Sequence, residues 1–465
     1  MEPKSIFFIG IGGIGMSAIA RYFLHQGKRV GGYDRTPTPL THALEAEGAS
    51  IHYEDNIELI APEFRDPTTT AVIYTPAIPS SHSELNYFLE GGFEVVKRSQ
   101  MLGILTHNKY VMAVAGTHGK SSTSTLAAWL NHEVERQGCA FLGAISKNFN
   151  SNLVLGAGDR ITVEADEFDR SFLRLNPDVA VITSTDADHL DIYGTHEALK
   201  EAFSQFVRQI KAGGTLILKH GVDITLDNPS IEIYRYSFTE PTDFYVSKRE
   251  QLPSSEFVYD ITTPDSVIEG CRLGIPGWVN MENSVAAVAM MWAAAKREGR
   301  VLNHDALRTA LCSYRGIKRR LDIWVNTPHN LYMDDYAHHP QEIRATLSSI
   351  AEIYPARKIT AIFQPHLYTR TRDLYEGFAE ALSLADEVVL LPIYPAREEP
   401  IEGITSEIIA RLVDAPCSII EKSSLVEHIA STPTDIVISF GAGDIDTLCS
   451  EISRTIENKA LIHEK

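Results

Sequence analysis

The sequence is poor in cysteine and lacks any long apolar run. Its 465 residues include five cysteines, which are dispersed and show no CxxC or CxH spacing. An odd, dispersed set argues against a disulfide framework and a thiolate zinc site, and indicates free thiols in a reducing compartment. No apolar run reaches the roughly 18 residues needed to span a membrane. The start, Met-Glu-Pro-Lys, runs straight into an expected strand with no room for a signal peptide, so we expect a cytoplasmic protein.

Basic residues are also in short supply. Lys and Arg number 42 against 61 Asp and Glu, which gives a formal net charge of −19. Nonspecific binding to nucleic acid or to an anionic membrane needs a basic surface, so we expect neither as a partner. A local cationic site for a small anionic ligand remains compatible with this composition.

Alternating strand and helix patterns divide the chain into three parts. At about 150 residues per domain, the length alone predicts roughly three domains. We expect these domains over residues 1–108, 109–317 and 318–465 of the sequence. The alternation predicts an α/β fold with parallel sheets, in which the first and third domains are Rossmann-like. In the middle domain, short β segments over residues 231–275 predict a small antiparallel sheet appended to the α/β core.

The strongest chemical motif follows the expected strand Tyr110–Ala115 and precedes an expected helix. This is the context of a phosphate-binding loop, in which glycines let backbone N–H groups surround phosphate oxygens. The lysine would reach the β- and γ-phosphates, and the first serine would ligate Mg²⁺. Only two residues separate the glycines, fewer than in the general motif, and a chance Gly-Lys-Ser remains the alternative. The motif consists of Gly116, Thr117, His118, Gly119, Lys120, Ser121 and Ser122.

A second glycine-rich loop follows the first expected strand, Ser5–Gly10. Its GxGxxG pattern is typical of a pyrophosphate site at a helix N-terminus, with Asp34 after the second strand placed to bind a ribose hydroxyl. The pattern does not separate NAD, FAD and a nucleotide sugar, and a purely structural glycine turn stays open. The glycines concerned are Gly10, Gly12, Gly13 and Gly15.

Two acidic segments lie in the middle domain, Glu164–Asp169 and Asp186–Asp191. Carboxylates and one histidine, His189, at the ends of strands beside a phosphate loop are suited to Mg²⁺. Solvated acidic surfaces are the alternative. In the third domain, arginines after the strand Ile359–Phe363 lie where α/β sheets bind ligands, and suit a carboxylate or phosphate unless they form surface ion pairs.

In combination, these segments resemble the Mur ligases. They occur in the order expected of that family, and the resemblance covers nearly the whole chain. It implies an N-terminal domain for a UDP-sugar, a central P-loop ATPase-type domain and a C-terminal domain for an amino acid. The matching segments are Gly10–Gly15, Gly116–Lys120, Glu164–Glu167, Asp188–Asp191, Arg315–Arg320, Asp334–Pro340 and Phe363–His366.

The resemblance implies ATP-dependent amide formation in peptidoglycan precursor synthesis, by way of an acyl phosphate. The substrates implied are UDP-N-acetylmuramate and L-alanine, with ATP and Mg²⁺, two ions during turnover, as cofactors. It further implies residue roles, which are as follows: ATP binding by Gly116–Ser122, Asn280, Asn283, Arg320 and Asp335; Mg²⁺ binding by Ser121, Glu164 and His189; amino-acid binding by Tyr336, His338 and Arg370; UDP-sugar binding by Gly10, Gly12, Gly13, Gly15 and Asp34; and catalysis by Lys120, His189, Arg320 and His338.

Three positions depart from the family pattern. Val279 stands where a histidine is common, Ser184 replaces a frequent asparagine, and Leu367 replaces a frequent arginine, leaving Arg370 with less help. Three alternative functions also stay open. They are a nicotinamide or flavin oxidoreductase, a P-loop protein that hydrolyses ATP without ligation, and a related ligase that adds a tripeptide to the same sugar.

Overall fold

The computed structural model describes residues 3–136, 138–188, 190–252, 257–396 and 398–463. Over these residues the strands form three sheets, of five, ten and six strands. The chain divides into two compact units, of which the first holds Met1–Glu250, Phe257–Gly274 and Glu282–Arg315, and the second Gln251–Glu256, Ile275–Met281 and Gly316–Lys465. No helix in the described part is both long and apolar enough to cross a membrane.

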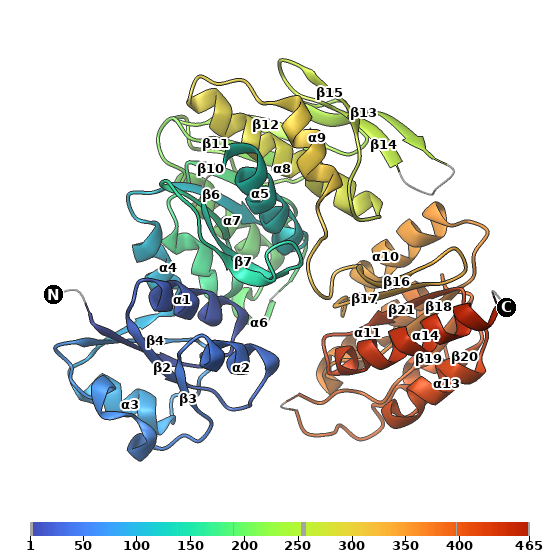
Figure 1. Cartoon of the computed structure of the whole chain (residues 1–465), viewed down its shortest axis with the longest axis horizontal. Coiled ribbons are helices and arrows are strands. Elements are labelled where there is room, and N and C mark those ends of the chain that lie inside the picture. Colours follow the sequence, from blue (N-terminus) through green and yellow to red (C-terminus); the bar gives the residue numbers. More distant parts are fainter. Residues whose placement is uncertain (1–2, 137, 189, 253–256, 397, 464–465) are drawn as a thin grey trace. The chain divides into compact units, whose positions relative to one another are not determined.

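The first sheet is parallel throughout, in the order β3-β2-β1-β4-β5 (Figure 1). The chain leaves β1 for β2 on one side and later returns to β4 on the other, so the glycine loop after β1 lies at the point where the strand order reverses. Ligands of doubly wound sheets bind at this point. The elements are β1 Ser5–Ile9, α1 Ile14–His25, β2 Arg29–Tyr33, α2 Pro39–Ala46, β3 Ser50–His52, β4 Thr70–Tyr74, α3 Ser83–Glu90, β5 Glu94–Lys97 and α4 Arg98–Thr106.

The second sheet runs in the order β15-β14-β13-β12-β11-β10-β6-β9-β7-β8. The strands that were expected to form an appended antiparallel sheet instead extend one edge of this sheet. Of their described pairings, β14 with β15 is antiparallel, whereas β12 is parallel to both β11 and β13. The elements are β6 Tyr110–Ala115, α5 Lys120–Glu135, β7 Cys139–Ser146, β8 Ser151–Val154, β9 Arg160–Glu164, β10 Val179–Ile182, α6 Leu190–Tyr193, α7 His196–Arg208, β11 Thr215–Lys219, β12 Glu232–Ser237, β13 Phe244–Gln251, β14 Phe257–Thr262, β15 Val267–Cys271, α8 Trp278–Arg297 and α9 His304–Cys312.

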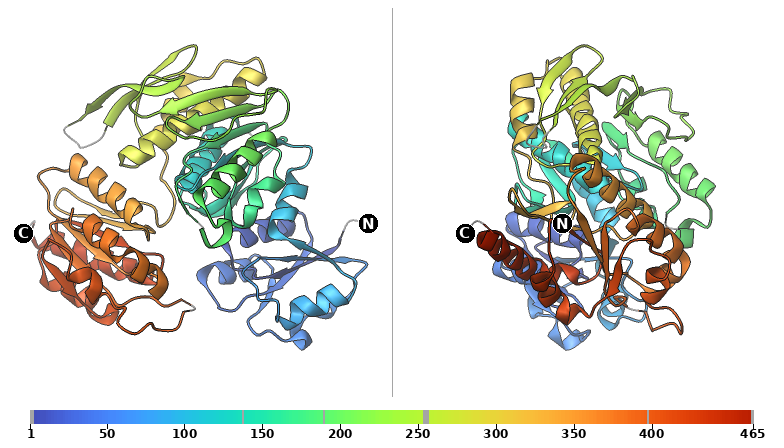
Figure 2. Two further views of the ribbon diagram at one scale, coloured as in Figure 1. Left: turned by 180° about the vertical axis from the view of Figure 1, so that it is seen from behind. Right: turned by 90° about the vertical axis from the view of Figure 1, so that its right-hand side faces the viewer.

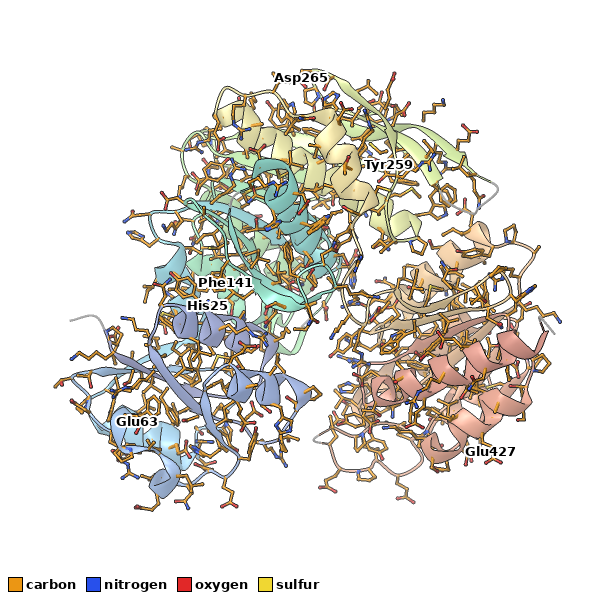
Figure 3. The ribbon with its side chains drawn as sticks, in the orientation of Figure 1. His25, Glu63, Phe141, Tyr259, Asp265 and Glu427 are labelled. Atoms are coloured by element: carbon orange, nitrogen blue, oxygen red, sulfur yellow. The ribbon has the colours of Figure 1, made fainter. Side chains whose placement is uncertain are left out.

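Helix α1 packs on β7 and β8, which joins the first two sheets within the first unit. Phe141 on β7 (labelled in Figure 3) contacts Tyr22 on α1, with ring centroids 5.7 Å apart. The buried amide of Asn152 on β8 donates to the Ile14 carbonyl at 2.6 Å and to the Ser17 hydroxyl at 2.8 Å. A buried polar side chain that is fully engaged fixes one packing arrangement, so the start of α1 is anchored to the second sheet.

The third sheet belongs to the second unit and has the order β16-β17-β21-β18-β19-β20, with β16 alone antiparallel to its neighbour among the described strands. Helices α10 and α11 pack together on one face, and α13 and α14 on the other (Figure 2). The elements are β16 Asp322–Asn326, β17 Leu331–Asp335, α10 Pro340–Ile353, β18 Ile359–Phe363, α11 Tyr368–Leu382, β19 Glu387–Leu390, α12 Glu407–Ala410, β20 Cys417–Ile419, α13 Leu425–Ser431, β21 Ile436–Phe440 and α14 Cys449–His463. The predicted α/β class, with Rossmann-like first and third sheets, is confirmed.

Candidate active site

The phosphate-loop motif joins the buried strand β6 to helix α5, as predicted. Gly116 and Gly119 have φ angles of +133° and +80°, a region that glycine adopts without strain. A Cβ at Gly116 would also lie 2.1 Å from the Thr183 hydroxyl oxygen. The two glycines therefore let the loop turn tightly against the end of the neighbouring strand β10.

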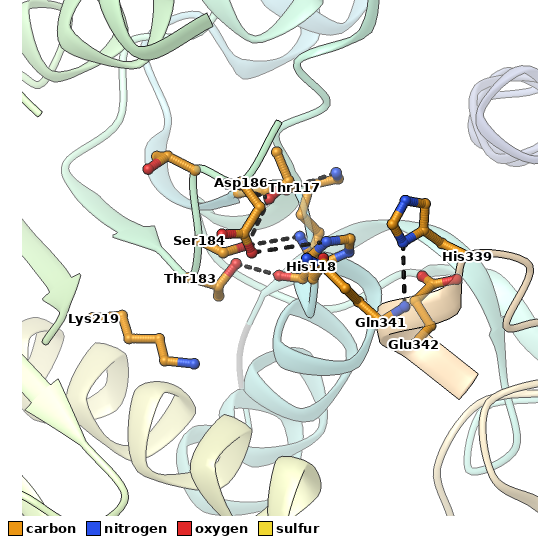
Figure 4. A network of polar contacts seen from close by, with 12 residues as sticks. Thr117, His118, Thr183, Ser184, Asp186, Lys219, His339, Gln341 and Glu342 are labelled. Carbon is orange, nitrogen blue, oxygen red and sulfur yellow. Dashed lines mark hydrogen bonds and ion pairs between the residues drawn. The ribbon is translucent and has the colours of Figure 1, made fainter. Parts of the chain in front are cut away.

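The segment after β10 holds the loop in place (Figure 4). The Ser184 hydroxyl accepts a hydrogen bond from the backbone N–H of His118 at 2.8 Å and contacts the Thr117 hydroxyl at 2.9 Å. The Thr183 hydroxyl donates to the His118 carbonyl, and the N–H of Asp186 donates to the Thr117 hydroxyl at 3.1 Å. Ser184, which the sequence marked only as a departure from the family, thus supports the loop directly.

Lys120 forms a buried ion pair in this loop. Its ammonium donates to the Gly116 carbonyl at 2.7 Å and to the Glu167 carboxylate at 2.8 Å. The Glu167 side chain is 0% exposed and that of Lys120 is 13% exposed. Burial alone would lower the pKa of Lys120, but the negative charge of Glu167 and the nearby acidic residues outweighs it and raises this pKa. The lysine is therefore held charged at the phosphate loop.

The acidic segment after β9 forms ion pairs with two basic residues where β5 ends and α4 begins. Asp166 accepts from Arg98 at 3.2 Å, and Asp169 accepts from Lys97 at 2.9 Å. Asp169 and Arg170 have φ angles of +51° and +53°, which costs energy for residues other than glycine. In this segment the carboxylates of Asp166, Glu167 and Asp169 form ion pairs, and Glu164 stays the predicted metal ligand.

The predicted Mg²⁺ ligands include residues suited to that ion. Ser121 lies in the first turn of α5, and Glu164 ends β9, opposite Val114 of β6, so both belong to the strand end that carries the loop. Hydroxyl and carboxylate oxygens are ligands that Mg²⁺ prefers. His189 lies outside the described residues. Within the described part, no group of three or more His, Cys, Asp and Glu side chains is placed to hold a metal ion.

The two asparagines predicted for ATP binding have different surroundings. Asn283 on α8 accepts from the Thr123 hydroxyl of α5 at 3.1 Å, and its amide oxygen is 3.1 Å from where a Cβ of Gly119 would lie. Asn280 donates to the Pro276 carbonyl at 2.6 Å and belongs to the second unit. The structure therefore brings Asn283 to the phosphate loop.

The glycine loop after β1 closes on Asp34. The backbone N–H of Gly12 donates to the Asp34 carboxylate at 2.7 Å, and Gly13 precedes the first turn of α1. Gly10 has a φ of +86°. Asp34, which is predicted to bind ribose, here orders its own loop. Each of its carboxylate oxygens has two lone pairs, so both oxygens can accept a further hydrogen bond.

In the second unit, aromatic and cationic side chains gather after β17. The guanidinium carbons of Arg319 and Arg320 lie 5.0 Å and 5.4 Å from the Tyr336 ring centre. Asp335, at the end of β17, accepts from the Thr346 hydroxyl at 2.7 Å and from the Ala337 N–H at 3.2 Å. Burial raises the pKa of Asp335 to about 6, although the charge of Arg320 opposes this.

His338 lies beside Tyr336, with ring centroids 5.2 Å apart. Its Nδ1 is 3.0 Å from the Tyr336 carbonyl oxygen, which can only accept, so Nδ1 carries the proton of the neutral ring. Burial lowers the pKa of His338, Glu342 opposes this, and the positive charge of Arg370 lowers the pKa further. The structure thus brings His338 and Arg370, two predicted amino-acid-binding residues, into electrostatic contact.

Behind this pair lies Tyr394, which belongs to none of the segments that the sequence singles out. His366 stacks on Tyr394, with centroids 5.8 Å apart, and lies 6.5 Å from the His338 ring. Leu367, which precedes α11 and Arg370, has a φ of +69°, a strained value for leucine. Its backbone is held by a hydrogen bond from its N–H to the Tyr394 carbonyl at 3.0 Å. This strained turn sets the start of the helix that carries Arg370.

Comparison with known proteins agrees with this architecture. Residues 5–110 match the model of the Mur ligase family, catalytic domain; residues 114–291 match the Mur ligase middle domain; and residues 319–443 match the Mur ligase, glutamate ligase domain. The chain is 47% identical over 462 residues to the UDP-N-acetylmuramate–L-alanine ligase of Phocaeicola vulgatus, covering 98% of this chain and 99% of that protein. It is 46% identical to the ligase of the same name from Parabacteroides distasonis, covering 98% of each.

Solved structures share the fold. The UDP-N-acetylmuramate-alanine ligase MurC of Thermotoga maritima superposes with a TM-score of 0.81 at 24% identity, covering 98% of this chain and 99% of that one. A murein peptide ligase from Psychrobacter arcticus gives a TM-score of 0.67 at 21% identity, with the same coverage. The family models span most of the chain, and the sequence relatives match nearly its full length. The chain therefore belongs to the Mur ligase family.

Proposed function

We propose that this chain joins L-alanine to the carboxylate of UDP-N-acetylmuramate, with ATP converted to ADP and phosphate, in the cytoplasmic synthesis of peptidoglycan precursors. The observation that carries the proposal is the full-length similarity to ligases of that name, at 41–47% identity. The phosphate loop with its charged lysine supports the ATP-dependent step.

A carboxylate is a poor electrophile and must first be activated. A carboxylate oxygen attacks the γ-phosphorus of ATP, the bond to the β-γ bridging oxygen breaks, and ADP leaves. The alanine amine then attacks the acyl carbon of the acyl phosphate, the bond to the phosphate oxygen breaks, and the amine loses a proton. Both steps bring anions together, so positioned cations and backbone donors reduce the barrier.

We assign the ATP site to Gly116–Ser122 with Asn280, Asn283, Arg320 and Asp335. Lys120 would neutralise charge on the transferring phosphoryl group. Ser121 and Glu164, together with His189, would hold Mg²⁺, one or two ions, which supplies further positive charge to the phosphates. We assign residues 109–317 to the central ATP-binding domain and residues 318–465 to the amino-acid-binding domain, which carries Arg320 and Asp335.

We assign the alanine site to Tyr336, His338 and Arg370. The guanidinium of Arg370 would bind the carboxylate of alanine. The lowered pKa of His338 keeps its imidazole neutral near pH 7, with Nε2 as the unprotonated nitrogen. Nε2 is then the atom that takes the proton released when the amine attacks.

We assign the nucleotide sugar to residues 1–108. Its pyrophosphate would bind the loop Gly10, Gly12, Gly13 and Gly15 at the start of α1, with Asp34 next to the ribose. Asp34 already accepts the Gly12 N–H at 2.7 Å, so the loop is ordered before the sugar binds.

The test is release of phosphate from ATP with UDP-N-acetylmuramate and one amino acid at a time, with mass spectrometry of the product. The expected result is a product heavier by one alanine residue, formed only when all three substrates are present. A product formed only with an intact tripeptide would identify the related tripeptide ligase. Phosphate release without any ligated product would identify an ATPase instead, and oxidation of a nicotinamide cofactor would identify an oxidoreductase.

A further inference from the structure

Arg98 lies against the N-terminus of α1 although it comes from a distant part of the first domain. It is the first residue of α4, and its side chain is 21% exposed. A Cβ built on Gly15, in the first turn of α1, would lie 2.6 Å from Nη1 and 3.3 Å from Cζ of Arg98. The absence of a side chain at Gly15 therefore makes room for this guanidinium, which gives the last glycine of the loop a physical role.

Hydrogen-bond donors gather at the N-terminus of α1. The backbone N–H groups of Ile14, Gly15 and Met16 have no hydrogen-bond acceptor among the described residues, as expected for the first turn of a helix. Among the described residues, the Arg98 side chain has one hydrogen-bond partner, Asp166, to which its Nη2 donates at 3.2 Å. The Nη1 donors remain, next to the N-terminus of the helix. Helix N–H groups and a guanidinium together suit a phosphate anion.

On its other side, Arg98 contacts the segment that holds the phosphate-loop lysine. Asp166 directly precedes Glu167, and the Glu167 carboxylate accepts from Lys120 at 2.8 Å. Helix α4 also packs closely on the segment after Glu167, because a Cβ at Gly103 would lie 2.8 Å from the Arg174 carbonyl oxygen. One guanidinium thus joins the start of α1 to Asp166, the residue before the one that pairs with Lys120.

We propose that Arg98 is a binding and positioning residue for the nucleotide sugar: its Nη1 side binds the pyrophosphate at the N-terminus of α1 while Nη2 holds Asp166. Two contacts from one rigid guanidinium set the distance between the pyrophosphate and the Lys120–Glu167 pair, which a lysine could not do. This inference rests on the proposed function, since it takes the nucleotide sugar as the ligand of the glycine loop.

The experiment is calorimetric titration of UDP-N-acetylmuramate into the full-length protein and its variants. Arg98→Ala should raise the Kd about tenfold or more, because a partly desolvated charge contact to the anion is lost. The control is Lys97→Ala, which removes the neighbouring Lys97–Asp169 ion pair between the same two segments, in which the lysine side chain is 39% exposed. The three atoms nearest to a Cβ on Gly15 all belong to Arg98 and none to Lys97. This variant should keep the Kd within about threefold, since exposed pairs contribute little.

Steady-state kinetics give a second reading. In Arg98→Ala the KM for the nucleotide sugar should rise while the KM for ATP stays within about threefold of native. Arg98→Lys should also raise the Kd, by about threefold or more, because an ammonium cannot serve both anions. This variant keeps the charge and tests the inference even if Arg98→Ala does not fold.

Two results would overturn the inference. One is a Kd for Arg98→Ala, or for Arg98→Lys where only that variant folds, within about twofold of native. The other is an equal loss in Lys97→Ala, which would mean that the two ion pairs merely hold the segments together. Failure of the proposed function is distinguishable, because the native protein itself would then not bind the nucleotide sugar.

Discussion

The Lys120–Glu167 pair should contribute strongly to the stability of the nucleotide-free protein. Lys120→Met keeps a side chain of similar length but removes the ammonium from a carboxylate that is 0% exposed. Removing one partner of a buried ion pair typically costs about 3–5 kcal/mol. Lys120 is 13% exposed, and Glu167 could take up a proton when its partner is gone, so we expect a loss of about 2–4 kcal/mol in the free energy of unfolding.

Urea unfolding without nucleotide measures this loss. Tryptophan fluorescence follows the unfolding, and one of the four tryptophans, Trp129, lies on α5, the helix that begins with Lys120. The double variant Lys120→Met/Glu167→Met should recover at least half of the loss, because an apolar pair of similar volume needs no charge compensation. The double variant also separates the ion pair from the packing of the two side chains.

Two outcomes would refute the reasoning. A loss below about 1 kcal/mol in Lys120→Met would mean that the carboxylate is not held ionised by the lysine. A double variant as unstable as the sum of both single variants would mean that the two residues contribute independently. Lys120→Met should in addition abolish ligation while leaving the binding of the nucleotide sugar in calorimetry unchanged.

Three further predictions concern other parts of the site. Arg370→Ala should raise the KM for L-alanine by about thirtyfold or more, with the KM values of ATP and the nucleotide sugar little changed in steady-state assays; an unchanged KM for alanine would place the amino acid elsewhere. In Gly12→Val, a Cβ would lie 2.7 Å from Thr41 Cγ2 and 2.8 Å from the Asp34 carboxylate, so the variant should displace Asp34 and raise the KM for the nucleotide sugar about tenfold; tight binding of NAD to the native protein would contradict the assignment of this loop. The folded pKa of Asp335, about 6, is above its unfolded value of roughly 3.9, so the native state binds the proton more tightly and this residue adds stability as pH falls from 7 toward 4. Urea unfolding at pH 7.5 and pH 5.0 should show native protein gaining about 1 kcal/mol relative to Asp335→Asn at the lower pH, and an equal response of both proteins would disprove the shift.

The sequence was sufficient to predict the sheets because buried parallel strands are continuous apolar segments. The strands Tyr110–Ala115 and Ile359–Phe363 are predicted with their observed bounds. The pairing of strands at the edge of the second sheet is harder to predict from the sequence. Residues 231–275 have the short segments of an antiparallel sheet, yet β12 pairs in parallel with β11. The direction of a strand relative to its neighbour depends on the connection between them and not on the strand's own residue pattern.

Within the site, the sequence predicts which residues form motifs, but it does not predict which side chains contact one another. The motif identifies Lys120, but its partner Glu167 is 47 positions away, and the sequence places Glu167 only in an acidic segment suited to Mg²⁺. Asp34 was predicted to bind ribose and is found on the Gly12 N–H. Arg98 lies outside the motifs described above, and only the packing of α4 brings it to Gly15. Such pairings depend on the three-dimensional arrangement of distant segments.

In the proposed ATP site, the position of Lys120 prepares the phosphate loop for the nucleotide. Placing an ammonium beside a γ-phosphate requires the removal of its water, which is costly if it happens during the reaction. Here the ammonium is already surrounded by the Gly116 carbonyl and the Glu167 carboxylate, so its hydration has been replaced during folding. When the γ-phosphate replaces the Glu167 carboxylate beside the ammonium, the lysine still has an anionic partner. A cation arranged in advance in this way is the form of electrostatic stabilisation that lowers the barrier to phosphoryl transfer without reorganisation at the time of reaction.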